Sequence, residues 1–306
     1  MVIAVTSPSF SKNQILRDEL KKYFPEAKFN EDGKKLEGEK LIDFVIDAEG
    51  IIAGLEKFDR EVIERLPNLK IISKYGVGLD NIDIEFCREK GIHIGWTPGT
   101  NRTSVAELSL AFMISLSRNV FITSNMLKRG IWHKDGGFDL SGKTVGIIGV
   151  GNIGKELIRL LKPFKTKILV NDIIDQTSYY RENNLKEVAK DEIYREADFI
   201  SLHVPLTEDT YHLINKKTLS QMKNTAFLIN TSRGKVVDET ALKWALMNNI
   251  IAGAAIDVYE EEPPDDEQLI SLPNLICTPH IGGNSFESVL AMGRSAIKHL
   301  REFFHK

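Results

Sequence analysis

TVGIIGVGNIG, residues 144–154, is an apolar run that breaks into the spacing G-x-G-x-x-G. The chain continues through residues 155–161 with apolar positions at helical spacing, so the pattern predicts a buried parallel strand, a tight turn and a helix. In such a unit Gly149 permits the turn, Gly151 lets the backbone approach a pyrophosphate, and Gly154 lets the helix and strand pack closely. The stretch therefore predicts a dinucleotide-binding site.

A second strand and an acidic residue strengthen this prediction. The start of the helix, at Asn152 and Ile153, offers N–H groups and a partial positive charge to phosphates. Residues 167–171 form another apolar run that ends at Asp172, about 20 residues after the glycines, where an acid that binds the adenosine ribose is expected. The Asp172 carboxylate would repel a 2′-phosphate, and residues 173–175 supply no arginine to bind one. The sequence therefore predicts NAD rather than NADP, the alternative being an exposed acid that closes the strand.

Length, charge and cysteine content limit the class of protein. The chain has 306 residues, enough for two domains, and a net charge of −3 gives no reason to expect nucleic acid or an anionic membrane as partner. No stretch approaches the ~20 apolar residues of a membrane span, and the N-terminus lacks the basic start of a signal peptide. Cys87 and Cys277 show no metal or redox spacing, which suits a reducing cytoplasm. We expect a cytoplasmic protein without a metal ion.

Strand–helix units repeat through both halves of the chain and predict parallel sheets with helices on both faces. The expected strands are residues 2–5, 50–53, 69–73, 92–95, 144–149, 167–171, 199–202, 226–230, 253–257 and 275–277. The expected helices include residues 11–24, 59–66, 83–90, 103–128 and 286–304. Turn residues cluster at residues 97–100 and mark a domain boundary. Helix 103–128 is apolar, so we expect it to be buried in its own domain or against a second subunit.

Four loops that follow predicted strands carry the polar side chains of a candidate site. They are HVPLT at 203–207, NTSRG at 230–234, DVYEEEP at 257–263 and TPHIGG at 278–283. Because the carboxyl ends of parallel strands meet at one edge of an open sheet, these loops are expected to converge. A further glycine loop, YGVGLDNID at 75–83, lies between a strand and a helix and by itself predicts an anion-binding nest.

Together these loops resemble the D-isomer specific 2-hydroxyacid dehydrogenases, a family that includes phosphoglycerate dehydrogenase, glyoxylate/hydroxypyruvate reductase and D-lactate dehydrogenase. The resemblance runs from Gly76 to His280 in the family's order and spacing. It implies an α/β fold of two doubly wound parallel-sheet, Rossmann-like domains with the active site in the cleft between them. Residues 1–97 plus 285–306 would be the substrate-binding domain, and residues 98–284 the NAD-binding domain. The resemblance also implies a homodimer, because in the family the helix that begins here near Asn101 packs across a dimer.

The same resemblance assigns roles to individual residues. The implied catalytic residues are Arg233, Glu262 and His280. The implied cofactor-binding residues are Gly149, Gly151, Asn152, Ile153, Gly154, Asp172, His203, Val204, Pro205, Thr231 and Asp257. The implied substrate contacts are Arg233 and the backbone N–H groups of Val77 and Gly78. Lys74, just before that glycine loop, is a candidate to attract a phosphorylated substrate, with a solvated lysine as the alternative.

These residue types suit the reduction of a 2-keto acid, in which a hydride goes to carbon and a proton goes to the developing alkoxide. His280, held protonated by Glu262, can donate that proton, and its neutral form can accept one in the reverse reaction. Arg233 can bind the substrate carboxylate and polarise the carbonyl with one planar fork, which a lysine could not copy. Residues 260–262 are all glutamate and could be a solvated face, but Pro263 sets the register and favours Glu262. The histidines expected to be structural or exposed are His93, His133 and His212.

We therefore expect an NAD-dependent oxidoreductase that acts on a D-2-hydroxy acid or its 2-keto acid, most like phosphoglycerate dehydrogenase. A nearby alternative is a glyoxylate or hydroxypyruvate reductase. The contrasting class is an NAD-sensing, corepressor-like binding protein of the same fold, since such proteins can keep the Arg–Glu–His set. The lack of tails on this chain favours the enzyme.

Overall fold

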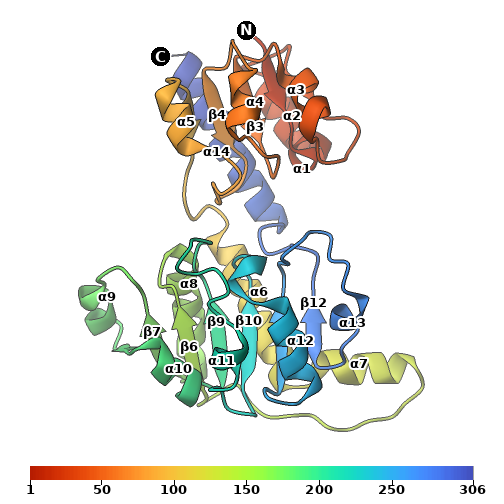
Figure 1. The fold of residues 1–306 in the computed structure, drawn as a ribbon, viewed down its shortest axis with the longest axis vertical. Coiled ribbons are helices and arrows are strands. Elements are labelled where there is room, and N and C mark those ends of the chain that lie inside the picture. Colours follow the sequence, from red (N-terminus) through yellow and green to blue (C-terminus); the bar gives the residue numbers. More distant parts are fainter. Residues whose placement is uncertain (306) are drawn as a thin grey trace. The chain divides into compact units, whose positions relative to one another are not determined.

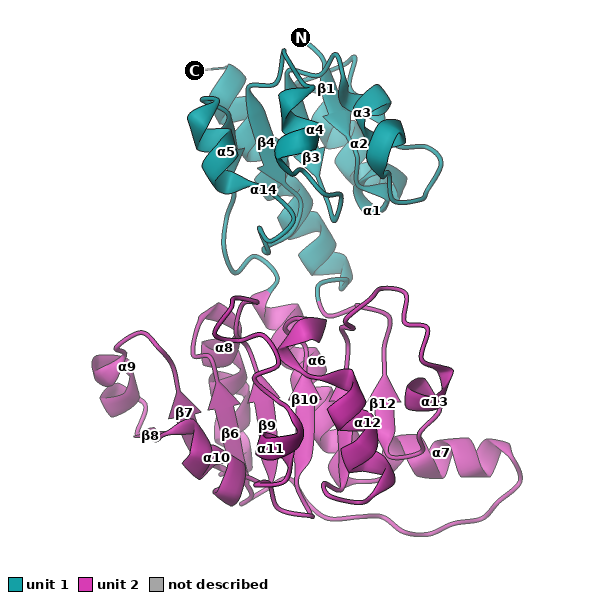
Figure 2. Ribbon diagram, in the orientation of Figure 1, with its two compact units in different colours: residues 1–101, 283–306 teal, residues 102–282 magenta. Residues whose placement is uncertain are grey.

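The protein, seen here in a computed structural model that describes residues 1–305, is built from two compact units. Unit 1 consists of Met1–Asn101 and Gly283–Lys306, and unit 2 of Arg102–Gly282 (Figure 2). Among the described residues, unit 1 contains a five-stranded sheet and unit 2 a seven-stranded sheet, and neighbouring strands in both pair in parallel. The predicted α/β class with two parallel sheets is confirmed.

Unit 1 has the strand order β2-β1-β3-β4-β5. Its strands are β1 (Ile3–Val5), β2 (Lys28–Phe29), β3 (Gly50–Ala53), β4 (Ile71–Lys74) and β5 (His93–Gly95). Its helices are α1 (Pro8–Lys12), α2 (Gln14–Lys21), α3 (Gly38–Val45), α4 (Arg60–Glu64), α5 (Ile84–Glu89) and α14 (Phe286–Phe304). The last helix of the chain, blue in Figure 1, therefore belongs with the first strands.

Alternation along the strands of unit 1 divides its core into two layers. Ile3 and Val5 pack in the cluster that contains apolar residues of α1, α2 and α14. Ala4, between them, packs in the cluster that contains residues of α3, α4 and α5. Because successive side chains of a strand point to opposite faces, short all-apolar strands bury both faces of the sheet.

Unit 2 has the strand order β12-β11-β10-β9-β6-β7-β8. Its strands are β6 (Thr144–Ile148), β7 (Lys167–Asn171), β8 (Lys186–Glu187), β9 (Phe199–Leu202), β10 (Phe227–Asn230), β11 (Gly253–Ile256) and β12 (Leu275–Cys277). Its helices are α6 (Arg102–Ser117), α7 (Val120–Lys128), α8 (Asn152–Leu161), α9 (Thr177–Glu182), α10 (Lys190–Glu196), α11 (Lys216–Leu219), α12 (Glu239–Met247) and α13 (Glu267–Ile270), with 3-10 turns at Lys162–Phe164 and Gly234–Val236.

The chain winds outward from the middle of this sheet in both directions. It runs from β6 through β7 to β8, returns to β9 on the other side of β6, and continues to β12. Residues of α6 and α8 pack on one face of the sheet, and residues of α10, α11 and α12 pack on the other. The strand order reverses between β6 and β9, and ligands of open α/β sheets bind at the carboxyl ends of strands beside such a reversal.

The expected helix of residues 103–128 is two helices. α6 ends at Ser117, and Asn119 has a φ of 52°, which lies in the left-handed region and stops the helix before α7 begins. α6 contains buried residues, whereas α7 contains none, so burial within the same domain is confirmed for α6, and burial of α7 against a second subunit stays a prediction. No single helix within residues 1–305 is long and apolar enough to cross a membrane, although α6 and α7, bent by 66°, pass that test of length and composition as a pair.

The expected helix of residues 11–24 is also interrupted. α1 begins after its N-cap, Ser7, and ends before Asn13, which has extended backbone angles and caps α2 with its side chain. Asparagine favours such a cap over helix continuation, because its side chain bonds to the backbone N–H groups that follow. Ser11, expected to be the cap, is instead buried within α1 and donates its hydroxyl to the Val5 carbonyl at 3.4 Å.

Candidate active site

The glycine turn after β6 depends on close backbone packing. Gly149 has a φ of 94°, in the left-handed region that favours glycine. A Cβ at Gly149 would lie 2.5 Å from the carbonyl oxygen of His203, and a Cβ at Gly154 would lie 2.2 Å from the carbonyl oxygen of Gly149. Both distances are too short for a carbon atom, so both glycines are needed to join β6 to α8 in this geometry.

The N-terminus of α8 has the features of a pyrophosphate site. Gly151 is the N-cap residue, and no side chain within residues 1–305 caps the helix there. A Cβ at Gly151 would meet no described atom within 4 Å, so the approach to the turn is open. Asn152 and Ile153 are the first helical residues, whose N–H groups have no intrahelical acceptor. Such N–H groups and the positive end of the helix dipole fit the two phosphates of NAD.

Asp172 follows β7, and three donors hold its carboxylate. Oδ2 accepts from the Val150 N–H at 2.6 Å and from Gln176 Nε2 at 3.2 Å, and Oδ1 accepts from the Ile174 N–H at 3.0 Å. Gln176 Nε2 also donates to the Val150 carbonyl at 2.9 Å, so Gln176 ties the carboxylate to the glycine turn. Asp172 thus lies beside the turn, where a ribose would follow the pyrophosphate. Sequence reasoning missed Gln176, because a lone glutamine before a short helix belongs to no motif.

His203 follows β9 at the same edge of the sheet. His203 Nε2 lies 2.9 Å from Ser201 Oγ, while Nδ1 is buried without a hydrogen-bond partner among the described residues. Burial lowers the pKa of His203 to about 4, so its ring is neutral at neutral pH. Val204 packs against the glycine turn, because a Cβ at Gly149 would lie 3.0 Å from Val204 Cγ1. With the exposed Pro205, this neutral surface suits the rings of a dinucleotide.

Arg233 is presented by a tight loop after β10. Asn230, only 1% exposed, accepts from the Ser232 N–H at 3.1 Å and the Ser232 hydroxyl at 2.7 Å, and its Nδ2 donates to the Arg233 carbonyl at 2.9 Å. Arg233 Nη1 in turn donates to the Ser232 carbonyl at 2.7 Å. Thr231 Oγ1 lies 3.0 Å from Ser109 Oγ on α6, which fixes the loop to that helix. Asn230 therefore organises the loop, a role that the sequence pattern did not reveal.

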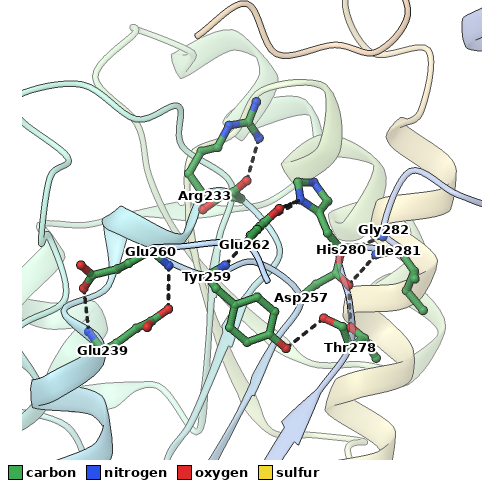
Figure 3. Close-up of polar contacts among 11 residues, drawn as sticks. Arg233, Glu239, Asp257, Tyr259, Glu260, Glu262, Thr278, His280, Ile281 and Gly282 are labelled. Atoms are coloured by element: carbon green, nitrogen blue, oxygen red, sulfur yellow. Dashed lines mark hydrogen bonds and ion pairs between the residues drawn. The ribbon is translucent and has the colours of Figure 1, made fainter. Parts of the chain in front are cut away.

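His280 and Glu262 form a hydrogen-bonded pair (Figure 3). His280 Nδ1 lies 2.8 Å from Glu262 Oε2 and 3.0 Å from Oε1, and the two side chains are 36% and 34% exposed. The hydrogen bond that His280 donates to the Glu262 carboxylate raises the pKa of His280 above its ordinary value, against the opposing effect of burial. Burial alone would raise the pKa of Glu262, but His280, the Tyr259 N–H and Arg233 together hold it below its ordinary value. The pair therefore favours a charged imidazolium beside a carboxylate.

The three consecutive glutamates have different surroundings. Glu262 is bonded to His280, whereas the carboxylate of Glu260 accepts from the Glu239 N–H at 3.1 Å. The side chain of Glu261 is 81% exposed, and its carboxylate lies 3.3 Å from Lys235 Nζ. The geometry therefore supports Glu262 as the partner of His280, and of the three glutamates it is Glu261 whose side chain is mostly solvated.

Asp257 anchors the loop that carries His280. Its side chain is 1% exposed, and its Oδ1 accepts from the Thr278 hydroxyl at 2.5 Å and from the Ile281 N–H at 2.8 Å. Its Oδ2 accepts from the Gly282 N–H at 2.7 Å (Figure 3). His280 has a φ of 53°, a conformation that non-glycine residues keep only where the surroundings hold it. The family resemblance placed Asp257 at the cofactor, and the structure adds this anchoring contact.

Lys74 ends β4 within a buried polar cluster of unit 1. It is 4% exposed, and its Nζ donates to the Gly54 carbonyl at 2.5 Å and to Asn81 Oδ1 at 2.7 Å. Asn81 Nδ2 donates to the same Gly54 carbonyl at 3.1 Å, so the three residues tie two loops together. Lys74 is therefore not a solvated lysine, because its ammonium group lies inside unit 1.

Val77 and Gly78 lie in the loop that follows Lys74, and both are half-buried. Gly76 has a φ of 131°, which only glycine adopts readily, and the Val77 carbonyl accepts from Trp96 Nε1 at 2.9 Å. Within the described chain, the N–H groups of Val77 and Gly78 donate to no other residue. Two neighbouring N–H groups without internal acceptors have the character of an anion-binding nest.

The remaining histidines named from the sequence lie in other surroundings. His93 stacks on Phe303 of α14 with ring centroids 5.6 Å apart, and His133 is exposed. His212 Nε2 lies 3.2 Å from Glu260 Oε1. Across residues 1–305, no group of three or more His, Cys, Asp and Glu side chains is arranged to hold a metal ion.

Comparison with protein families gives a match over residues 110–282, to the family described as D-isomer specific 2-hydroxyacid dehydrogenase, NAD binding domain. The matched range contains the glycine turn, Asp172 and the loops that carry Arg233, Glu262 and His280. Among solved structures, the chain is similar to D-lactate dehydrogenase from Aquifex aeolicus in complex with NAD and lactic acid. That likeness has a TM-score of 0.87 at 28% identity and covers 100% of this chain and 96% of the other.

Curated relatives extend the similarity over nearly the whole chain. A glyoxylate reductase of Pyrococcus horikoshii is 40% identical over 89% of this chain and 84% of its own length. A hydroxypyruvate reductase of Thermotoga maritima is 39% identical over 84% of this chain and 85% of its own length. A D-3-phosphoglycerate dehydrogenase of Methanocaldococcus jannaschii is 38% identical over 86% of this chain, but the match spans only 51% of that relative.

Proposed function

The chain belongs to the D-isomer specific 2-hydroxyacid dehydrogenase family and is an NAD-dependent oxidoreductase, and we propose that it reduces small, unphosphorylated 2-keto acids such as glyoxylate or hydroxypyruvate. The observation that carries the proposed chemistry is the bond of His280 Nδ1 to the Glu262 carboxylate, at 2.8 Å. The sequence alone favoured phosphoglycerate dehydrogenase. The curated relatives support the alternative better, because reductases of unphosphorylated acids match over most of their own length.

The residues of this chain supply binding and proton transfer. Reduced NAD, when bound, supplies the hydride that goes to the keto carbon. Protonated His280, held through Nδ1 by Glu262, donates the Nε2 proton to the carbonyl oxygen as it becomes an alkoxide. Glu262 stays ionised and stabilises the charged ring. In the oxidative direction the neutral ring accepts the hydroxyl proton. The guanidinium of Arg233 binds the substrate carboxylate in a planar fork and polarises the carbonyl.

Lys74 bears on the choice between phosphorylated and unphosphorylated substrates. A phosphate group needs a cation whose donors can turn toward it. The ammonium group of Lys74 already donates to Gly54 and Asn81 inside unit 1, so a phosphate would have to displace those contacts. We therefore assign Lys74 to the support of the substrate loop, and the N–H groups of Val77 and Gly78 to the substrate carboxylate.

NADH oxidation in the presence of different 2-keto acids tests the proposal. We expect kcat/KM to be highest for glyoxylate or hydroxypyruvate, and at least about 10-fold lower for 3-phosphohydroxypyruvate, the keto acid of a phosphoglycerate dehydrogenase. A preference for the phosphorylated acid would contradict the proposal and favour a phosphoglycerate dehydrogenase. Binding of NADH without turnover of any of these acids would favour the NAD-sensing, corepressor-like alternative.

We also propose that the protein is a homodimer joined through α7 and the segment after it. Val120, Phe121 and Leu127 of α7 are 49%, 39% and 57% exposed, and Ile131 and Trp132 are 51% and 78% exposed. Several large exposed apolar side chains along one short segment are typical of an interaction surface. Light scattering at micromolar concentration should give twice the chain mass of 34.5 kDa, and a mass equal to one chain would contradict the dimer.

The division of roles between domains remains part of the proposal. Substrate binding is assigned to residues 1–97 with 285–306, and NAD binding to residues 98–284. Gly78→Pro, which removes the backbone N–H assigned to the substrate carboxylate, should then raise KM for the keto acid and leave the Kd of NADH unchanged. Asp172→Ala should raise the Kd of NADH and leave KM for the keto acid unchanged. The cytoplasmic location and the absence of nucleic-acid and membrane partners stay predictions from the sequence.

A further inference from the structure

Glu260 and Glu239 are joined by two reciprocal hydrogen bonds beside Glu262 (Figure 3). The Glu239 N–H donates to Glu260 Oε1 at 3.1 Å, and the Glu260 N–H donates to Glu239 Oε1 at 2.7 Å. Glu239 is the first residue of α12, whose opening N–H groups have no intrahelical acceptor. Each glutamate therefore satisfies the backbone of the other, and α12 holds the segment that leads to Glu262.

Two further contacts connect this pair to the loops of the candidate active site. The Tyr259 N–H donates to Glu262 Oε1 at 3.2 Å, so the segment of residues 259–262 folds back on itself. A Cβ at Gly234 would lie 1.9 Å from the carbonyl carbon and oxygen of Tyr259 and 2.4 Å from the nitrogen of Glu260. The loop of Arg233 thus packs directly on the peptide between Tyr259 and Glu260. A shift of that peptide must disturb both Glu262 and the Arg233 loop.

Capping of α12 alone does not explain the arrangement. The side chain of Asp238 already caps the helix by accepting from the Ala241 N–H at 2.9 Å. Glu260 adds a second carboxylate there, close to that of Glu239, and His212 lies 3.2 Å from Glu260. Burial raises the pKa of Glu239, and the nearby Glu260 carboxylate adds to this rise. The hydrogen bond from the Glu260 N–H opposes it. Two carboxylates brought together in a partly buried place are unfavourable for folding by themselves.

We propose that Glu239 and Glu260 form a clasp that positions Glu262 against His280 and supports the loop of Arg233. Both are positioning residues, because they act through Glu262 and the Tyr259–Glu260 peptide. The inference rests on the proposed function, in which Glu262 keeps His280 protonated. The charged groups that face His280 are Glu262, Asp257 and Arg233, and the clasp constrains the first of them through the Tyr259–Glu260 peptide, because the Tyr259 N–H donates to Glu262.

The pH dependence of kcat for keto-acid reduction tests the clasp, with Glu260→Ala compared to Glu261→Ala. Loss of the clasp lets Glu262 move away from His280, so the pKa of His280 falls and the alkaline limb of the profile should move to lower pH by about half a unit or more. KM for the keto acid should rise through the disturbed Arg233 loop. Glu261→Ala removes an exposed neighbour of the same type and should match the parent. Glu260→Gln should restore much of the profile, because its amide oxygen accepts the same hydrogen bond.

A Glu260→Ala variant that lowers the melting temperature but leaves the alkaline limb and KM at the parent values would overturn the proposal. If Glu260→Ala does not fold, Glu239→Ala answers the same question. It removes only the acceptor of the Glu260 N–H and keeps the backbone N–H that binds the Glu260 carboxylate. Its alkaline limb should also move to lower pH, and an unmoved limb would reject the clasp.

A double-mutant cycle separates failure of the clasp from failure of the proposed function. Glu262→Gln alone should move the limb, and adding Glu260→Ala to it should move the limb no further, because Glu260 acts through Glu262. If Glu262→Gln leaves the limb in place, the assignment of Glu262 and His280 is wrong. If Glu262→Gln moves the limb and Glu260→Ala alone does not, only the clasp is wrong.

Discussion

Asp172 and Asp257 occupy equivalent places in the sheet of unit 2 and differ in what they hold. Each directly follows a parallel strand, β7 or β11, and each accepts three hydrogen bonds. Asp172 is half-buried, and its donors come from the glycine turn and from the residues just after it. Asp257 is 1% exposed, and its donors all belong to the loop after β12, which carries His280.

The comparison shows how one topological position serves two purposes. A carboxylate after a parallel strand always reaches the carboxyl edge of the sheet. Burial and the source of the donors then decide whether it faces a ligand or fixes a neighbouring loop. On our proposal the Asp172 side of the sheet selects the cofactor, and the Asp257 side holds the proton donor. The two sides should therefore respond differently to mutation.

The largest effect is expected at the proton donor. His280→Ala should lower kcat for keto-acid reduction by on the order of 10²–10⁴-fold, the usual contribution of a positioned acid. The Kd of NADH should change little, because His280 is assigned to neither ribose nor pyrophosphate. Stopped-flow turnover and NADH fluorescence titration on one preparation check both values. A large loss of NADH affinity would contradict the proposal that cofactor binding and proton donation are carried by different sides of the sheet.

Asp257→Asn should have the next largest effect. An asparagine can accept at one atom only, so its amide nitrogen would face an N–H group of Ile281 or Gly282. One buried N–H left unsatisfied destabilises the fold by about 1–3 kcal/mol, and a loosened His280 should lower kcat by up to about 10²-fold. Thermal unfolding and steady-state kinetics measure the two effects. Parent-like kcat would show that Asp257 does not hold the catalytic loop.

Asp172→Ala should act on the cofactor and spare the chemistry. Loss of the carboxylate removes hydrogen bonds to the ribose and the repulsion of a 2′-phosphate, so kcat/KM for NADH should fall by about 10-fold and the preference over NADPH should narrow. The value of kcat at saturating NADH should stay near that of the parent. Equal efficiency with NADH and NADPH in the unmodified protein would contradict the assignment of Asp172.

The smallest effect is expected at Gln176, which orients Asp172 without facing the ribose itself. Gln176→Ala removes one donor to the carboxylate and one to the Val150 carbonyl, so KM for NADH should rise by about 2- to 10-fold at unchanged kcat. Asp175→Ala is the matched control, because Asp175 bonds to Thr177 in the same turn. Identical KM values for the two variants would show that Gln176 does not contribute to NADH binding.

Most strands of the unit 2 sheet could be predicted from the sequence because a buried strand consists of a short run of apolar residues. Residues 167–171, 199–202 and 275–277 are strands with the predicted bounds. The glycine turn was equally readable, since Gly149 and Gly154 are needed where no Cβ fits. The pairing of His280 with Glu262 came from the family resemblance, and the structure now gives it a distance.

Other features lie beyond what a sequence pattern carries. Asn119 stops α6 by a left-handed backbone angle, although nothing in the apolar periodicity changes there. Gln176, Asn230 and the clasp of Glu239 with Glu260 depend on contacts between loops. The sequence favoured phosphoglycerate dehydrogenase over its alternative because the whole family shares the motifs of the site, and the curated relatives support the glyoxylate or hydroxypyruvate reductase alternative better.

The central claim is that Glu262 keeps His280 protonated, and the pH–rate profile of Glu262→Gln in both directions tests it most directly. In the parent, Glu262 raises the pKa of His280, so loss of the carboxylate charge should lower that pKa toward or below its ordinary value. Reduction uses the protonated ring, so its alkaline limb should move to lower pH. Oxidation uses the neutral ring and should extend to lower pH, while Glu261→Gln, the exposed neighbour, should leave both limbs in place. Limbs that stay in place in Glu262→Gln would contradict the account.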